Sequence, residues 1–314
     1  STQSYSSSES HYFVVRGNSG SIFNCNFGQN PSFSGTVTAG TYTDSNGRGL
    51  FKYQPPAGYL ALCEDNLPAP AIADPGEHFK TVLWTGDGNT GRSITGVGFQ
   101  PDFVWIKERA GTSNHNLYDS VRGVTKRLYS DLVNAEYTYT NGNGVNSFDS
   151  DGFSFGADGA LNQDTIPTVA WCWKAGGAAV SNTDGTITSQ VSANQTAGFS
   201  IVSYTGNETN NATVGHGLGK VPDMIIVKNR NSAVAWGVWH SSLTSGQVLR
   251  LNQTTEAQTP ATAYFQDENN TSSVFALGTN DETNDSDGDT YIAYCWAEIE
   301  GFSKFGSYEG NGNA

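Results

Sequence analysis

The sequence predicts an all-β protein built of tandem β-sandwich domains of the jelly-roll or concanavalin-like kind. Its composition is low in charge (15%) and includes 37 glycines, which is typical of short strands joined by many turns. No stretch shows the sustained 3.6-residue apolar period of an amphipathic helix. A unit of about 120 residues also occurs twice, which is the size of one β-sandwich and too long for a solenoid repeat.

The first segment, residues 1–74, does not match the repeated unit. The stretch "YFVVRGNSGSIFNCNF" (12–27) holds two strand signals around a Gly-Asn-Ser-Gly turn. The stretch "GLFKYQPPAGYLALCEDNLPAP" (49–70) gives a further strand, a Pro-Pro turn and a short apolar piece. We expect this segment to be the closing part of a different β-sandwich.

The two copies of the unit occupy residues 75–178 and 196–301. The phrase "PDFVWIKER" (101–109) returns as "PDMIIVKNR" (222–230), and "VAWCWK" (169–174) returns as "IAYCWA" (292–297). Each phrase contains an apolar run that suits a central strand covered on both faces. The proline before the first strand stands where its missing N–H removes no ladder bond. We therefore expect two sandwiches of like topology.

Two shorter segments complete the division of the chain. Residues 179–195 are small, polar and turn-rich, so they are expected to form a linker, in which one edge strand is an option. Residues 302–314 begin a third copy, because "GFSKFGSYEG" (301–310) is similar to "GFSIVSYTGN" (198–207). A first strand cannot close a domain by itself, so we expect the native chain to continue.

Charge and cysteine content exclude several classes of function. The net charge of −14 repels polyanions, so nucleic acids and anionic lipids are poor partners. No apolar run reaches about 18 residues, so no membrane insertion is expected. The four cysteines form no CxxC pair, which argues against zinc. Cys172 and Cys295 lie at equivalent strand positions and are expected to be buried thiols, while a Cys25–Cys63 bridge is left open.

The motifs resemble parts of known phage proteins. "NCNFGQNPSF" (24–33) with "FKYQPPAGYLALCEDNLPAP" (51–70) resembles the closing strands of SPRY-like modules in long bacteriophage proteins. The repeated Pro-Asp-apolar-Lys-x-Arg and Cys-Trp phrases resemble the tandem domain that follows such modules in virion proteins of marine phages and cyanophages. The resemblance implies a tail-fibre or virion-surface protein assembled in the host cytoplasm, and it implies no reaction. We expect the chain to bind other virion proteins. We also expect it to form a homo-oligomer, for which a trimer is one option.

No constellation of residues requires an enzyme. A glycosidase needs two acids about 5–10 Å apart on rigid walls. Asp102 and Asp223 follow a proline at a strand start in both copies, and we expect them to cap that strand. The basic pairs Lys107/Arg109 and Lys228/Arg230 are expected to neutralise carboxylates such as these two. A glycan-degrading enzyme remains the third hypothesis after the two given below.

Aromatic residues and histidines indicate a candidate sugar contact. "SAVAWGVWHSSL" (232–243) places Trp236 and Trp239 three residues apart with His240 beside the second. His216 stands in a glycine-flanked turn, and Tyr118 is the first-copy equivalent of Trp239. Aromatic rings stack on the C–H faces of sugars, and imidazole can bond a hydroxyl. Alternating Trp and Val is equally the pattern of a buried strand, so the core is the competing interpretation.

One acidic run is a candidate calcium loop. Asp285, Asp287 and Asp289 alternate around Gly288, but position 296 is Trp where a calcium loop of the EF-hand type needs a bidentate Glu. The alternative is a solvated loop that keeps a hairpin from pairing with neighbours. No other cofactor is expected.

Two hypotheses of function follow. The first is a phage virion-surface or tail-fibre protein that attaches to a host glycan, where repeated domains multiply a weak contact. The second is an architectural spacer or capsid decoration protein without a ligand. A concave patch of exposed aromatics would favour the first, and flat polar surfaces with large protein contacts would favour the second.

Overall fold

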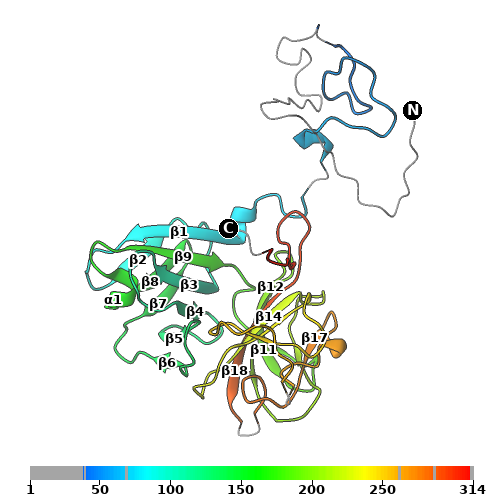
Figure 1. Ribbon diagram of the computed structural model, residues 1–314. Coiled ribbons are helices and arrows are strands. Elements are labelled where there is room, and N and C mark those ends of the chain that lie inside the picture. The colour runs from blue at the N-terminus through cyan, green and yellow to red at the C-terminus, as the bar shows by residue number, and fades with distance from the viewer. Residues whose placement is uncertain (1–37, 39, 68–69, 261–262, 286–287, 312–314) are drawn as a thin grey trace. The chain divides into compact units, whose positions relative to one another are not determined.

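The computed structural model describes residues 38, 40–67, 70–260, 263–285 and 288–311, and it is all-β, as predicted (Figure 1). Helices in the described residues are single turns: α1 (Gly159–Asn162), η1 (Glu64–Asn66), η2 (Pro75–Glu77) and η3 (Asp267–Asn269). No described helix has the length and apolar character needed to cross a membrane. Packing divides the chain into two units, Ser1–Ala69 and Pro70–Ala314.

The described part of the first unit is a small turn-rich piece. Tyr42 pairs with Phe51 in an isolated antiparallel bridge. Asp44 is buried, and its carboxylate accepts hydrogen bonds from the backbone N–H groups of Arg48 and Ala61 at 2.8 Å each. The strand signals predicted between residues 12 and 27, with Cys25, lie outside the described residues, so the SPRY-like assignment stays a prediction.

The second unit begins with a lobe that corresponds to the first copy. Its larger sheet has six antiparallel strands in the order β1-β9-β3-β4-β5-β6, and its smaller sheet has the order β2-β8-β7. The strands are β1 (Phe79–Thr85), β2 (Arg92–Thr95), β3 (Phe103–Glu108), β4 (Asn116–Asp119), β5 (Lys126–Tyr129), β6 (Tyr137–Thr138), β7 (Val145–Asp149), β8 (Gly152–Phe155) and β9 (Pro167–Trp173). We call this part, residues 75–178, lobe 1.

The second copy forms lobe 2, residues 179–301. Its larger sheet has seven strands in the order β10-β11-β12-β18-β14-β15-β16, and β13 pairs with β17 in a smaller sheet. The strands are β10 (Val180–Asn182), β11 (Ser189–Asn194), β12 (Phe199–Thr205), β13 (Ala212–Gly215), β14 (Met224–Asn229), β15 (Gly237–His240), β16 (Leu249–Arg250), β17 (Val274–Leu277) and β18 (Thr290–Trp296). The segment predicted as a linker thus supplies β10 and β11, which extend the sheet.

The two lobes share one strand order. The run β1-β9-β3-β4-β5 in lobe 1 corresponds to β12-β18-β14-β15-β16 in lobe 2. Trp105 pairs with Trp171 in the first, and Ile226 pairs with Tyr294 at the same place in the second. The repeated phrase is therefore the central strand of each larger sheet.

The larger sheets are covered on both faces, and the first four residues of each central strand, 103–106 and 224–227, are apolar. In β3, Val104 and Ile106 belong to the core of lobe 1, while Phe103 on the other face enters a second core between the lobes. In β14, Ile225 lies in the core of lobe 2 and Ile226 in the shared core. The two larger sheets therefore pack against each other, and each smaller sheet lies on the outer face of its own larger sheet. The two copies are not independent domains, since they share this core.

Buried charges also join the lobes. Arg122 is fully buried and donates to the carboxylates of Asp119 and Glu136, while the Tyr294 hydroxyl of lobe 2 donates to Asp119 at 2.7 Å. Arg230 of lobe 2 holds Glu136 through two hydrogen bonds of 2.9 Å. Burial by itself would raise the pKa of Glu136, but Arg230 and Arg122 outweigh it and lower that pKa.

The polar residues that recur in both copies of the repeat have structural roles. Asp102 accepts from the N–H groups of Ala175 and Gly177, and Asp223 accepts from the N–H of Glu298, so each carboxylate caps the end of the neighbouring strand, β9 or β18, and not the start of its own strand as expected.

The prediction that the basic pairs neutralise carboxylates holds for Arg230, which bonds Glu136, but the lysines do not bond Asp102 or Asp223. Lys107 instead donates to the carbonyls of Glu108 and Gly111, and Lys228 donates to those of Asn229 and Ser232. Each ammonium group thus bonds the backbone at the end of its own strand and in the loop that follows.

Candidate functional site

The structure places the predicted sugar-contact residues in the interior. Tyr118 and Trp239 lie in the cores of lobe 1 and lobe 2, and Trp236 lies in the shared core. His216 is fully buried and accepts a hydrogen bond from the Leu218 N–H at 3.2 Å. Only His240 is partly exposed.

A sugar contact through these five residues is therefore wrong. The physical reason is that β15 is sandwiched between two apolar layers, so the alternation of Trp and Val describes a strand buried on both faces. The indole N–H of Trp236 donates to the Tyr129 carbonyl of lobe 1 at 2.8 Å, which makes it a contact between lobes.

The acidic run is partly engaged within the fold. The Asp289 carboxylate accepts from Asn229 Nδ2 at 2.8 Å and from the Ser232 hydroxyl at 3.0 Å. The N–H of Asp285 donates to the Tyr291 hydroxyl at 2.8 Å. Asp287 lies outside the described residues, and within them no group of three or more His, Cys, Asp or Glu could hold a metal ion. Calcium at this loop stays a prediction.

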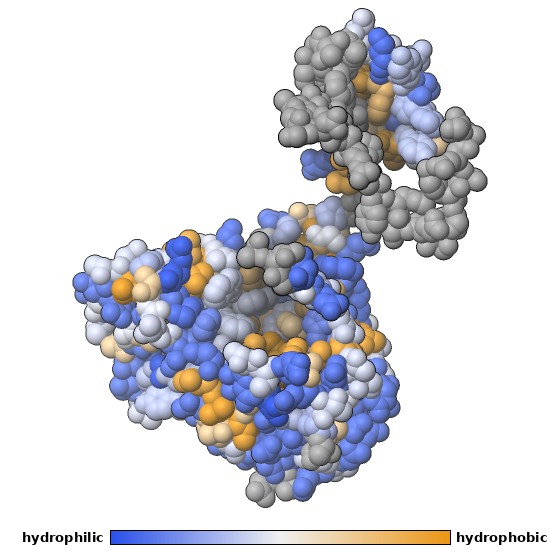
Figure 2. Space-filling view, viewed as in Figure 1, coloured by the Kyte–Doolittle hydropathy of each residue, from blue (hydrophilic) through white to orange (hydrophobic). Residues whose placement is uncertain are grey.

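An aromatic cleft opens where the two lobes meet. Its volume is about 340 Å³, and Figure 2 shows hydrophobic residues gathered at the hollow between the lobes. Both lobes and the turn after β18 contribute side chains, of which only two are polar. The lining residues are His78, Phe79, Trp105, Trp173, Ala197, Phe199, Met224, Ile226, Trp296, Phe302, Ser303 and Phe305.

The walls of the aromatic cleft are built from equivalent positions of the two copies. Phe79 pairs across strands with Trp173, and Phe199 pairs with Trp296 in the same register. The ring centroids of these pairs lie 4.9 and 5.2 Å apart, and the two tryptophans stand edge to face at 6.4 Å. One Phe–Trp pair at the end of each larger sheet thus meets its counterpart.

The tryptophans of the cleft differ from those of the cores in exposure and in hydrogen bonding. Trp105, Trp173 and Trp296 are half-buried, so part of each indole faces the cleft. The Trp105 indole donates to His115 Nδ1 at 2.8 Å. No hydrogen bond is recorded for the indole N–H of Trp173 or Trp296 within the described part of the chain. Each therefore offers a ligand a ring face and a donor.

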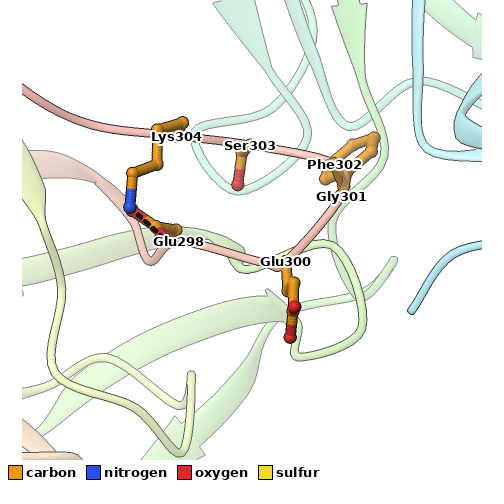
Figure 3. A pocket seen from close by; sticks show the side chains of 6 residues that line it. All are labelled: Glu298, Glu300, Gly301, Phe302, Ser303 and Lys304. Carbon is orange, nitrogen blue, oxygen red and sulfur yellow. Dashed lines mark hydrogen bonds and ion pairs between the residues drawn. The ribbon is translucent and has the colours of Figure 1, made fainter. Parts of the chain in front are cut away.

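The turn after β18 forms one rim of the cleft and carries charge. Phe302 and Phe305 point their rings to the cleft, and the Ser303 hydroxyl accepts from the Ile299 N–H at 3.0 Å. Figure 3 shows the adjoining hollow of about 520 Å³, where Glu298 and Lys304 point toward each other and Glu300 points away. The hydrogen bond from Lys304 at 2.7 Å lowers the pKa of Glu298, so this rim is ionised near neutral pH.

A comparison with known proteins places this region in one family. Residues 74–314 match the model of a family described as a domain of unknown function, DUF7483. The chain belongs to that family. No curated protein and no solved structure matches the chain. The DUF7483 match covers both lobes and the aromatic cleft between them.

Sequence reasoning noticed the Cys-Trp phrase of the DUF7483 region but gave it no function. A usable signal is present in "VAWCWK". Because side chains alternate along a strand, a buried Cys172 puts Trp171 and Trp173 on the opposite face. The sequence could not show that the second copy leaves part of that face uncovered.

Proposed function

We propose that the chain is a non-catalytic module of a bacteriophage virion surface or tail fibre, and that its aromatic cleft binds a carbohydrate of the host cell. The observation that carries the binding part is the presence of three half-buried tryptophans in one cleft of about 340 Å³. That volume falls in the range of about 300–1,000 Å³ typical of small-molecule sites.

The chemistry of the cleft suits a sugar ring with an apolar face. The C–H groups on one side of a pyranose pack against an indole, and we take each contact to be worth as much as a pair of aromatic side chains, about 0.5–1.5 kcal/mol beyond area burial. Hydroxyl groups at the edge of the ring would meet His78, Ser303 and Glu298 at the rim. An apolar floor with a polar rim therefore supports binding.

The particle-surface part of the proposal rests on the sequence resemblance and on the construction of the two lobes. A shared core and the Arg122–Glu136–Arg230 ion cluster hold the lobes as one unit. The net charge of −14 suits a surface that repels nucleic acid and stays soluble.

The same construction supports a second candidate, an architectural spacer without ligand. Two lobes joined through a core and buried ion pairs form a rigid spacer, whether or not a ligand occupies the cleft. The two candidates differ in what happens to the cleft tryptophans when carbohydrate is offered.

The deciding experiment screens the full chain on a glycan array and then titrates the best oligosaccharide. We expect binding that quenches tryptophan fluorescence. Trp173→Ala and Trp296→Ala should each weaken it about 2- to 10-fold, since each removes one stacking contact. Tyr137→Ala is the matched control, because Tyr137 is an exposed aromatic outside the cleft. An array on which the wild-type chain binds nothing would leave the spacer as the function.

A further inference from the structure

The two lobes differ at one edge of their larger sheets. In lobe 2, β12 pairs with β11 from Ser189↔Tyr204 to Asn194↔Phe199, and β10 follows outside β11. The equivalent strand of lobe 1 is β1, which is the outer edge of its sheet (Figure 1). Within the described residues, no strand lies on the outer side of β1.

The backbone pattern identifies which groups of β1 point outward. The N–H of Lys174 donates to the His78 carbonyl, and the N–H of Gly86 donates to the Ile166 carbonyl, both at 2.9 Å. Residues with even numbers therefore bond to β9, and those with odd numbers direct N–H and C=O away from it. The Thr85 carbonyl accepts from Arg92 at 2.7 Å. For the outward groups of Thr81 and Leu83, no partner is recorded among the described residues.

The side chains of β1 leave this edge open to another strand. Leu83 is 61% exposed, and Thr81 and Thr85 are exposed beside it. Lys80 is the only charged residue of β1, so the edge carries none of the acidic groups that dominate the chain. Exposed strands that lack several charges, a proline or a bulge are templates for pairing.

The chain before β1 does not cover it as β11 covers β12. Pro75 opens the turn η2 directly before the strand, and Pro70 lies five residues earlier. Proline lacks the N–H that a pairing strand must donate. At the equivalent place in lobe 2, "TSQVSANQ" (188–195) contains no proline and forms β11.

We propose that β1 pairs with the β1 strand of a second copy of this chain, antiparallel about a two-fold axis. Centred on Val82, this register places Thr81 opposite Leu83 of the partner, so that their outward N–H and C=O groups bond reciprocally. The exposed Leu83 side chain then packs beside the partner strand. Lys80 faces Trp84 of the partner rather than a second lysine.

The two-fold arrangement explains why a second copy fits better than a foreign strand. Two identical edges pair with each other about the two-fold axis, and this pairing closes the β1 edge of both chains, as in other isologous dimers. The other outer strands of the two larger sheets, β6, β10 and β16, have only two or three residues each and offer shorter templates. The dimer would carry two aromatic clefts, and Phe79 belongs both to β1 and to the cleft of its own chain.

The test measures the mass of the full chain by sedimentation equilibrium at about 100 µM, a concentration at which a pair with a Kd of about 10 µM is mostly associated. We expect a dimer for the wild-type chain. Thr81→Pro removes an outward N–H without removing a bond to β9, and Leu83→Lys adds a charge to the open edge. Both variants should be monomers with wild-type circular dichroism, whereas Val180→Lys on β10 should stay dimeric.

The proposal is overturned if the wild-type chain is monomeric at this concentration, or if Leu83→Lys leaves the dimer intact. A dimer lost in Val180→Lys but kept in Leu83→Lys would place the interface at β10 and would also overturn it. If Thr81→Pro does not fold, Leu83→Lys decides by itself. Carbohydrate binding is not part of this test, so its result is independent of the proposed function.

Discussion

Lobe 1 and lobe 2 share the strand order of their larger sheets. They differ in the polar side chains at the contact between the lobes and at the ends of the central strands. The position of Asp119 in lobe 1 is His240 in lobe 2, since both face the residue that begins the central strand. Three residues later, Arg122 in lobe 1 corresponds to Leu243 in lobe 2. The buried Arg122–Asp119 pair therefore belongs to lobe 1 alone, although Arg230 and Tyr294 of lobe 2 bond to the same cluster, and the apolar alternation that forms the core is common to both lobes.

A second difference lies at the end of the central strands. Asn229 in lobe 2 accepts from the N–H groups of Asn231 and Ser232 and donates to the Tyr291 hydroxyl. Its equivalent in lobe 1 is Glu108, whose buried Oε1 has no hydrogen-bond partner in the described structure. An amide can both donate and accept, whereas a carboxylate only accepts. The comparison teaches that backbone topology tolerates different local chemistry at equivalent sites.

The largest effect is expected from breaking the contact between lobes. Trp236→Ala removes a fully buried indole from the shared core together with its hydrogen bonds to the carbonyls of Tyr129 and Leu132. We expect the free energy of unfolding to fall by about 3–5 kcal/mol. Guanidinium unfolding followed by circular dichroism measures it. A loss below about 1 kcal/mol would show that the lobes are not coupled through this core.

The second effect tests the buried Arg122–Asp119 pair, which lobe 2 lacks at the equivalent positions. Arg122→Leu gives lobe 1 the residue of lobe 2 but leaves Asp119 buried without its cation, so we expect a loss of about 3 kcal/mol or more. Adding Asp119→Asn should recover most of that loss, since the uncompensated charge is gone. Thermal unfolding of the single and double variants measures both. No recovery in the double variant would contradict a charge-based explanation.

The third effect separates the two equivalent lysines by pH. Burial lowers the pKa of Lys228 from 10.5 to about 8, against the attraction of Glu282. Between pH 8 and pH 10.5 this lysine is protonated in the unfolded chain but neutral in the folded chain. The free energy of unfolding therefore rises with pH across this range, by up to about 3 kcal/mol. Urea unfolding from pH 8 to 10 should show the rise in wild type and in Lys107→Met, and a smaller rise in Lys228→Met. Equal slopes in all three would exclude Lys228 as the source.

The smallest effect compares the two strand-capping carboxylates. Asp102 accepts from the Ser120 hydroxyl and from two backbone N–H groups, whereas Asp223 accepts from the N–H of Glu298. Asp102→Ala should therefore destabilise the chain by about 1–2 kcal/mol more than Asp223→Ala, since more buried donors lose their partner. Differential scanning calorimetry of the two variants measures the difference, and the reverse order would contradict it.

Parts of this structure follow from local patterns in the sequence. Apolar runs such as 103–106 predict central strands, and the repeated phrase predicts that Trp105 and Ile226 hold equivalent places, as the pairing confirms. These predictions succeed because they depend on neighbours in the chain.

The candidate site could not be predicted in the same way. The apolar second face of β3 predicts that another layer covers this strand. Residues of lobe 2 more than 120 positions away form that layer, and they determine which side chains remain exposed in the cleft. Trp236 and Trp173 look alike in sequence, yet the first is fully buried and the second lines the cleft. The pairing of β11 with β12 was missed because its residues are small and polar, so no hydrophobic signal marks the strand.

The shared core has a consequence for how such a chain can change by duplication and loss. A gene that lost one copy would expose the outer face of the remaining larger sheet, including Phe103 or Ile226. A chain with a single copy would therefore leave this apolar face open to water, whereas a chain with the pair covers it. The family match from residue 74 to residue 314 spans both copies. In an array built this way the pair is the inherited unit, and the single repeat is only its half.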